Sequence, residues 1–302
     1  MGFRIVEISR PGELHVQKGQ LQIEQEEGQC SIPVEDIMCL LFTGTNIRIS
    51  TMALTILAEA GVQVILCNTN NMPSAILTPA EGNYQQSLVM YKQIEMDLEM
   101  KNAMWTKIVR RKIENQAEAL KILGNDVGSQ TVLKYLDNLS SGDMQNCEGS
   151  AAKAYFQYYW PGLVRKEESP INSALNYGYA IIRTYISKRL YCVGLLAALG
   201  VHHANQFNAF NLADDLIEPF RPMVDLLALE IGNKGIRLSK EERHKLIEIL
   251  HYKCMFNGNS YSIDLTVDKV INSLKTAILE NDINALVLPS VIPLEKTSSV
   301  RE

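Results

Sequence analysis

The stretch HHANQFNAFNLADDLIEPFRPMVD, residues 202–225, decides how the helical part of this chain is interpreted. Its first seventeen residues, 202–218, gather two histidines, two aspartates and a glutamate among small and apolar neighbours, and such groups are ligands of hard or borderline divalent cations. Asp215 and Glu218 are three residues apart, so a helix would carry both on one face. Pro219 and Pro222 each remove a backbone donor. We therefore expect the helix to break there and to hold a carboxylate at a helix end.

A structural role also explains part of this pattern. Asp214 lies about 100° around the same helix from Asp215, and an acidic pair before a helix usually caps it and compensates its dipole. A histidine in a stretch rich in Ala and Asn is more often a hydrogen-bonded structural residue than a ligand. A metal site therefore needs a further candidate ligand from elsewhere in the chain.

Residues 146–156, NCEGSAAKAYF, supply that candidate. Glu148 is followed by four small residues, which let another segment approach the backbone closely. The alternative is that Glu148 is a first-turn glutamate favoured by the helix dipole. That alternative explains the charge but not the small residues beside it.

Together the two segments resemble the CRISPR-associated adaptation integrases, the family of endonucleases and integrases that capture foreign DNA as new spacers. The similar motifs are E-G-x-A-A and H-x-N-Q-F-N-x-F-N-L-A-x-D-L-I-E-P-F-R-P. The motif H-A-N-Q-F-N followed by E-P-F-R-P is most similar to the family members that accompany type II CRISPR systems. The N-terminal strands, ISTMALTILAEAGVQVILCN (49–68) and INSALNYGYAIIR (171–183) extend the resemblance over most of the chain.

The resemblance implies that Glu148, His203 and Glu218 are the metal ligands and the catalytic residues. His203 is chosen over His202 because it immediately precedes the phrase Ala-Asn-Gln-Phe-Asn, as the family histidine does. Asp215 matches an acid that the family often retains one turn before the glutamate. It could be a ligand, a group that orients a ligand, or a contributor to local charge only.

The chemistry follows from the motifs that are present and absent. The sequence has no Gly-x-Ser-x-Gly elbow, no phosphate-binding loop and no dinucleotide fingerprint, so it offers no obvious nucleophile of its own. A metal ion on three ligands keeps positions open for water and phosphate, and it can polarise a phosphodiester. With water as nucleophile the reaction is DNA hydrolysis. With a DNA 3′-hydroxyl it is strand transfer into the repeat, as the resemblance implies. Mixed nitrogen and oxygen ligands suit Mg²⁺ or Mn²⁺.

The resemblance also implies partners. These are double-stranded DNA, as the captured fragment and the CRISPR repeat, and a second copy of the chain bound through the β domain. Two such homodimers bridged by a dimer of a small ferredoxin-like adaptation protein would form a heterohexamer, and other proteins of type II CRISPR systems could join it. The early strands are short, and a small sheet has edges to cover, which supports dimerisation independently.

Two functions of other classes remain open. A metal-dependent hydrolase of another phosphoester or small substrate would use the same ligand set but would not bind duplex DNA. A catalytically silent scaffold would bind DNA and a partner only, and metal-dependent nicking of DNA would exclude it.

Composition is typical of a folded soluble protein, and the resemblance implies the prokaryotic cytoplasm as its location. The 302 residues are 46% hydrophobic and 21% charged, and the length allows two domains. No apolar run reaches the length of a membrane helix, and the N-terminus lacks the apolar core of a signal peptide, so no membrane association is expected. The six cysteines are scattered without a C-x-x-C pair, which argues against a zinc knuckle and for a reducing compartment.

The net charge of −5 has the wrong sign for a simple nucleic-acid binder. Distribution matters more than the sum, however. Basic residues cluster at Lys107–Lys112 and at Arg183–Arg189, and we expect these clusters to provide a salt-sensitive, metal-independent part of DNA binding. The alternative for each cluster alone is a solvated helix face.

The periodicity changes near residues 73–85, and this predicts an α+β fold: a small β-rich N-terminal dimerisation domain (1–72), a linker (73–85) and a larger all-α-helical catalytic domain (86–302). A helix capped by Ser50 and stopped by Gly61 precedes a buried strand. Residues 84–123 predict one bent helix or two, and residues 289–302 predict a mobile tail. The expected strands are Phe3–Ile8, Leu14–Val16, Leu21–Glu24 and Ile37–Phe42. The further expected helices are Thr131–Leu139, Asn146–Tyr159, Ile171–Leu199, Ala213–Ile231, Lys240–His251 and Thr266–Glu280.

Overall fold

The structure, a computed structural model, describes residues 4–69, 73–77, 84–231 and 238–297. The chain forms two compact units. Unit 1 comprises Met1–Tyr91 and Ser187–Leu195, and unit 2 comprises Lys92–Ile186 and Leu196–Glu302. The predicted α+β class is confirmed, because a β-rich N-terminal part precedes a mostly helical part. No feature of the sequence predicted that Ser187–Leu195 would belong to the first unit.

Unit 1 is built on two four-stranded sheets. The first has the order β1-β5-β7-β8, with β1, β5 and β7 parallel and β8 antiparallel to β7. The second has the order β4-β3-β2-β6, in which β2, β3 and β4 form an antiparallel meander and β6 pairs parallel to β2. The strands are β1 (Arg4–Ile8), β2 (Gly12–Gln17), β3 (Gln20–Gln25), β4 (Gly28–Pro33), β5 (Ile37–Phe42), β6 (Ile47–Ile49), β7 (Gln63–Cys67) and β8 (Pro73–Leu77).

Local chemistry explains these elements. The sequence Lys18-Gly19-Gln20 predicts a hairpin turn between two strands, and this is confirmed, because Lys18 and Gly19 both have positive φ (52° and 73°), as a two-residue hairpin turn requires. In β3, Leu21 and Ile23 alternate into the core of the unit. Helix α1 (Thr51–Glu59) begins at Ser50, whose side chain accepts from the backbone N–H of Ala53, as predicted. Strand β4 was not predicted, because its polar residues lack an apolar alternation.

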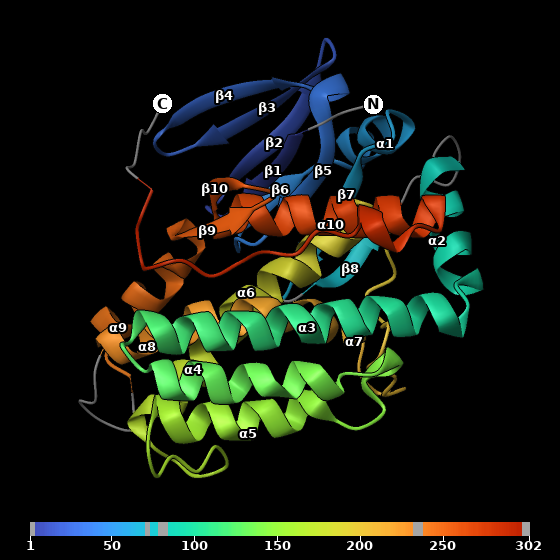
Figure 1. Cartoon of the computed structure of the whole chain (residues 1–302). Coiled ribbons are helices and arrows are strands. Elements are labelled where there is room, and N and C mark those ends of the chain that lie inside the picture. The colour runs from blue at the N-terminus through green and yellow to red at the C-terminus, as the bar shows by residue number, and fades with distance from the viewer. Residues whose placement is uncertain (1–3, 70–72, 78–83, 232–237, 298–302) are drawn as a thin grey trace. The chain divides into compact units, whose positions relative to one another are not determined.

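Unit 2 is organised around the long helix α3, which begins at the cap residue Asp97. Helices α3, α4 and α5 pack side by side (Figure 1). None of the helices in the described part of the chain is long and apolar enough to cross a membrane. The helices are α2 (Tyr84–Glu95), α3 (Leu98–Ile122), α4 (Asp126–Leu133), α5 (Cys147–Tyr159), α6 (Pro170–Cys192), α7 (Asn211–Leu216), α8 (Arg221–Ile231), α9 (Lys240–Ile247) and α10 (Ile263–Glu280); α2 and α6 contribute to both units.

The helical segments differ from the predicted ones where the backbone is interrupted. The run 84–123 is two helices separated at the Asp97 cap. The predicted helix 213–231 is divided into α7, a 3-10 turn at Glu218–Phe220 and α8, because Pro219 and Pro222 interrupt it as expected. A hairpin of β9 (Lys253–Phe256) and β10 (Asn259–Ser262), which was not predicted, precedes α10.

The predicted mobile tail is wrong for residues 289–297. The Asn115 side chain of α3 donates to the carbonyl of Pro289 (3.0 Å), and its oxygen accepts from the backbone N–H of Val291 (3.1 Å). Leu288 and Val291 are buried. Pro289 and Val291 are therefore part of the core of unit 2, and only residues 298–302 of the predicted tail lie outside the described residues.

Candidate metal centre

Glu148 lies in the first turn of α5, where other side chains cap the helix. Asp143 accepts hydrogen bonds from the backbone N–H groups of Cys147 (2.7 Å) and Glu148 (2.9 Å), and Asn146 caps the same turn. The carboxylate of Glu148 is therefore free of capping, and its Oε1 contacts Lys112 Nζ of α3. Capping therefore does not account for Glu148, although its first-turn position also suits the helix dipole.

Glu218 lies at the break between α7 and α8 and is buried. Its Oε2 contacts Lys112 Nζ, and its Oε1 accepts from Arg221 Nε at 2.9 Å. Glu148 and Glu218, far apart in sequence, thus converge on the single ammonium group of Lys112. From the sequence, Lys112 was expected only to belong to a DNA-binding basic cluster, and Arg221 was assigned no role.

The charges in this cluster balance. Burial raises the pKa of Glu218, but Lys112 and Arg221 lower it further, so the net pKa lies below its usual value. Burial lowers the pKa of Lys112, but Glu218 and Glu148 outweigh it and the net pKa is raised. Lys112 and Glu218 are therefore both charged near neutral pH and pair with each other. Buried ions are tolerated only when paired in this way.

Asp215 is fully buried and holds the segment that carries His203. Its Oδ2 accepts from the backbone N–H groups of Val201 (2.7 Å) and His202 (3.2 Å). Its Oδ1 accepts from the His203 backbone (3.1 Å) and lies 2.7 Å from His203 Nδ1. With Nδ1 donating to this carboxylate, the ring presents Nε2 with a free lone pair. This is the arrangement by which carboxylates orient metal-binding histidines.

The two adjacent histidines lie in different environments. His202 stacks on the buried Trp105 of α3, with ring centroids 4.1 Å apart and planes 4° from parallel. His203 meets the same indole edge-on at 5.9 Å and leaves its side chain 44% exposed. His202 is therefore used in packing, whereas His203 is accessible to a ligand.

The structure brings two of the three predicted ligands onto one cation and places the third nearby. The hydrogen bond with Asp215 raises the pKa of His203 against the effect of burial, and the charge of Glu218 adds to the rise. Within the described residues, no three His, Cys, Asp or Glu side chains are already gathered as a metal site. Two carboxylates that share one cation beside an oriented imidazole nevertheless form a donor set that fits Mg²⁺ or Mn²⁺.

Comparison with known proteins identifies the family of the chain. The family model described as CRISPR associated protein Cas1 matches residues 6–248. The chain belongs to the Cas1 family. The CRISPR-associated endonuclease Cas1 of Neisseria meningitidis serogroup C (strain 8013) is 31% identical over 98% of this chain and 99% of its own length. A CRISPR-associated endonuclease Cas1 of Pyrobaculum aerophilum is 28% identical over 77% of this chain and 83% of its own.

Solved structures share the Cas1 fold. A casposase bound to its integration product has a TM-score of 0.71 at 20% identity and covers 93% of this chain and 96% of its own. A Cas1 protein of Thermotoga maritima has a TM-score of 0.69 at 19% identity and covers 92% and 97%. A partial Cas6-RT-Cas1–Cas2 complex has a TM-score of 0.73 at 17% identity and covers 95% and 98%.

The basic cluster Lys107–Lys112 of this Cas1 chain is not the open surface expected from sequence. Lys107 donates to the carbonyl of Ile283 (3.0 Å), Arg111 donates to Ser290 Oγ (2.9 Å), and Lys112 pairs with Glu148 and Glu218. Arg110 is its exposed member. Three of the four cations are therefore committed to contacts inside unit 2.

The basic cluster Arg183–Arg189 is also committed to contacts within the chain. Arg183 donates twice to Asp214, at 2.5 and 3.1 Å, and Lys188 lies 3.3 Å from Glu7. These cations pair with acids of their own units. Fewer positive charges of this segment are therefore available for DNA phosphates than its sequence suggested.

A buried hydrogen-bond network surrounds Asp225, four residues after Arg221 in α8. The hydroxyls of Tyr155 (2.9 Å) and Tyr179 donate to its carboxylate, and Tyr159 donates to its backbone carbonyl (2.7 Å). Arg221 lies over the Tyr179 ring, 4.6 Å from its centroid. The aromatic residues after Glu148 thus pack in the core and link α5, α6 and α8 behind Glu218.

Asp225 makes the stability of unit 2 dependent on pH. Burial raises its pKa from 3.8 to about 6, although Tyr179 and Tyr155 oppose the rise. The folded state therefore holds this proton more tightly than the unfolded state, and stability falls by about 3 kcal/mol as pH rises from about 4 to about 6, then levels off. We expect Asp225→Asn to remove that part of the pH dependence. Urea unfolding followed by tryptophan fluorescence tests this, because Trp105 and Trp160 both lie in unit 2.

The matched control is Asp137→Asn, the same change at an exposed aspartate of unit 2. It should keep the slope of the original protein between pH 4 and 6. An equal slope in the Asp225 variant and the original protein would show that Asp225 does not titrate as described.

Proposed function

We propose that this Cas1 chain is a metal-dependent DNA endonuclease and integrase of CRISPR adaptation, which inserts captured foreign DNA as new spacers in the prokaryotic cytoplasm. The observation that carries the proposal is the convergence of Glu148 and Glu218 on one buried cation beside the oriented His203. The names of the relatives, CRISPR-associated endonucleases, and the likeness to a casposase bound to its integration product support the same conclusion.

The side chains of the proposed site have different roles. Glu148, His203 and Glu218 would hold Mg²⁺ or Mn²⁺, which when bound supplies Lewis-acid activation of the scissile phosphodiester. Asp215 keeps the His203 ring in the tautomer that offers Nε2. Arg221 keeps Glu218 ionised and oriented from the opposite side of its carboxylate. The attacking group is a DNA 3′-hydroxyl in strand transfer and water in cleavage.

This function is tested by an assay in which a labelled DNA fragment with a free 3′-hydroxyl is joined to a target duplex that contains the repeat. We expect joined product with Mg²⁺ or Mn²⁺ and none with a chelator. A fragment ending in a 3′-dideoxynucleotide should not be joined, because it lacks the nucleophile, whereas hydrolytic nicking of the target should persist. Joining that continues in the chelator would refute the metal dependence.

A metal-dependent hydrolase of another phosphoester or small substrate is the alternative. It would hydrolyse a small phosphodiester such as bis(p-nitrophenyl) phosphate faster than it nicks DNA, and it would not bind branched duplex DNA. The same protein preparation can be assayed on both substrates, so the ratio of the two rates separates the alternatives.

The proposal includes partners. Double-stranded DNA serves as captured fragment and as CRISPR repeat. A solved structure related to this chain in fold contains Cas1 with Cas2. We infer a small ferredoxin-like adaptation partner, a dimer of which joins two homodimers into a heterohexamer, together with other proteins of a type II system. If a neighbouring gene encodes such a small protein, its co-purification at a ratio of two copies of this chain to one tests that assembly.

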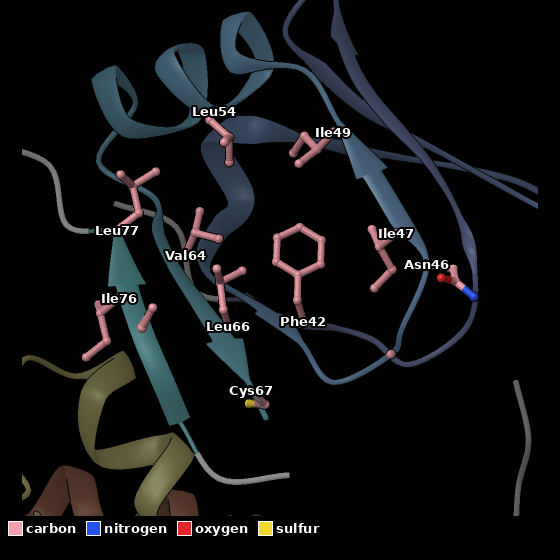
Figure 2. Close-up of a pocket in the computed structure, with 12 residues that line it drawn as sticks. Phe42, Asn46, Ile47, Ile49, Leu54, Val64, Leu66, Cys67, Ile76 and Leu77 are labelled. Atoms are coloured by element: carbon pink, nitrogen blue, oxygen red, sulfur yellow. The ribbon is translucent and has the colours of Figure 1, made fainter. Parts of the chain in front are cut away.

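We infer that the homodimer forms through unit 1, where an apolar pocket of about 530 Å³ opens (Figure 2). Phe42 and Ile47 line it, and Leu66, Ile76 and Leu77 are large apolar side chains left exposed beside it. Strand β8 is the outer strand of its sheet in the described residues. An exposed apolar patch next to a sheet edge is typical of an interaction surface.

Ile76→Asp is therefore expected to convert the dimer into a monomer, because it places a charge in the apolar contact. Light scattering at micromolar concentration should give the mass of one chain, 33.9 kDa, instead of twice that value. Ile247→Asp, the same change at an exposed isoleucine of unit 2, should remain dimeric. A monomeric original protein would contradict the inferred dimer.

A further inference from the structure

Lys112 takes part in the metal centre but has no role in the reaction proposed above. It lies near the middle of α3, its side chain is buried, and Nζ contacts Glu148 Oε1 and Glu218 Oε2. The charged groups that face it come from α5 and from the α7–α8 break, and they are Glu148, Glu218 and Arg221. With Lys112 itself, these groups sum to zero charge.

A divalent ion would upset this balance. Its bonds to carboxylate oxygens are about 2.0–2.6 Å long, and the two oxygens that converge from α5 and η4 (Glu218–Phe220) already face the Lys112 ammonium. Retaining Lys112 in place would leave an excess of two positive charges in a buried site, which is strongly unfavourable. One cation must therefore withdraw when a metal ion enters.

Lys112 is better suited to withdraw than Arg221. Arg221 is held by Glu218 Oε1 on one side and by the Tyr179 ring on the other. A lysine ammonium is a point charge on a flexible four-carbon stem, whereas a guanidinium is a rigid planar fork. The lysine can swing aside by rotation of its stem while the arginine keeps Glu218 in position.

We propose that Lys112 is a built-in counter-ion that holds Glu148 and Glu218 together in the metal-free protein and is displaced by the divalent cation. This proposal rests on the proposed function, since it takes these two carboxylates to be metal ligands. It makes Lys112 a positioning residue. The ammonium keeps two like charges from separating before the metal arrives, and in return it competes with the metal and weakens its binding.

Manganese binding to Lys112→Met tests the proposal. Met keeps most of the side-chain volume but removes the competing charge, so we expect the dissociation constant for Mn²⁺, measured by electron paramagnetic resonance, to fall about tenfold or more. The metal-free variant should melt at a lower temperature than the original protein, because its carboxylates repel each other. Its melting temperature should rise more on addition of Mn²⁺.

Lys107→Met is the matched control, because it makes the same change on the same helix at a lysine bound to the Ile283 carbonyl. Its Mn²⁺ affinity should equal that of the original protein. Unchanged or weaker Mn²⁺ binding by Lys112→Met would overturn the proposal.

Two further measurements complete the test. If Lys112→Met does not fold, mass-spectrometric acetylation of the original protein replaces it: labelling of Lys112 should increase with Mg²⁺, and equal labelling would overturn the proposal. Mn²⁺ binding to Glu148→Gln and Glu218→Gln shows whether a negative result contradicts the counter-ion role of Lys112 or the metal site itself. If both variants bind Mn²⁺ as the original protein does, the proposed metal site itself is wrong; if both lose binding but Lys112→Met does not gain it, only the counter-ion is wrong.

Discussion

Alanine in place of Glu148, His203 or Glu218 should reduce metal-dependent strand transfer by at least about a thousandfold, equivalent to about 4 kcal/mol of transition-state stabilisation. Each change removes one of three donors, and the remaining two do not hold a divalent ion in a catalytic position. The rate of joining of a labelled 3′-hydroxyl fragment, at saturating Mg²⁺, measures the loss. Glu114→Ala, which removes an acid of α3 that pairs with Arg111 instead, should retain the original rate.

The three variants should differ in stability, and this separates ligand roles from folding roles. Glu218→Ala leaves the buried Lys112 and Arg221 without their carboxylate and should destabilise unit 2 by about 3–5 kcal/mol. His203→Ala changes a side chain that is 44% exposed and should have little effect on unfolding. A variant that keeps the original strand-transfer rate would show that its residue is not a ligand.

Asp215→Ala should lower Mn²⁺ affinity and strand transfer by about 10–100-fold without removing a ligand, because the carboxylate orients His203. It should also destabilise unit 2 by about 1–3 kcal/mol, since the backbone N–H groups of Val201, His202 and His203 lose their acceptor. Manganese titration and urea unfolding measure the two effects on the same samples.

Asp214→Ala is the control for Asp215, because it removes the neighbouring acid of α7, which binds Arg183 and Asn208 instead. It should leave Mn²⁺ affinity unchanged. A complete loss of strand transfer in Asp215→Ala, equal to that of the ligand variants, would contradict an orienting role and make Asp215 a direct ligand.

The sequence by itself determined the features that depend on neighbouring residues. The turn at Lys18-Gly19, the Ser50 cap and the helix break at Pro219 and Pro222 follow from backbone chemistry that is local to each. The long motifs around Glu148 and His203 were specific enough to indicate the family, which the match over residues 6–248 shows.

Only the tertiary structure decided which charges meet. A lysine within a helix ordinarily faces solvent, and nothing in the sequence around Lys112 distinguishes it from Lys107. In the folded chain, however, Lys112 lies between two carboxylates, whereas Lys107 donates to a backbone carbonyl. The role of Asp215 likewise depends on a reversal of the chain that brings residues 201–203 onto its carboxylate. Residues 289–297 were predicted to be mobile because their sequence favours neither a helix nor a strand. In the folded chain, the Asn115 side chain forms hydrogen bonds with Pro289 and Val291 that hold this segment. Local patterns record backbone preferences, whereas ion pairs between distant residues exist only after the helices have packed.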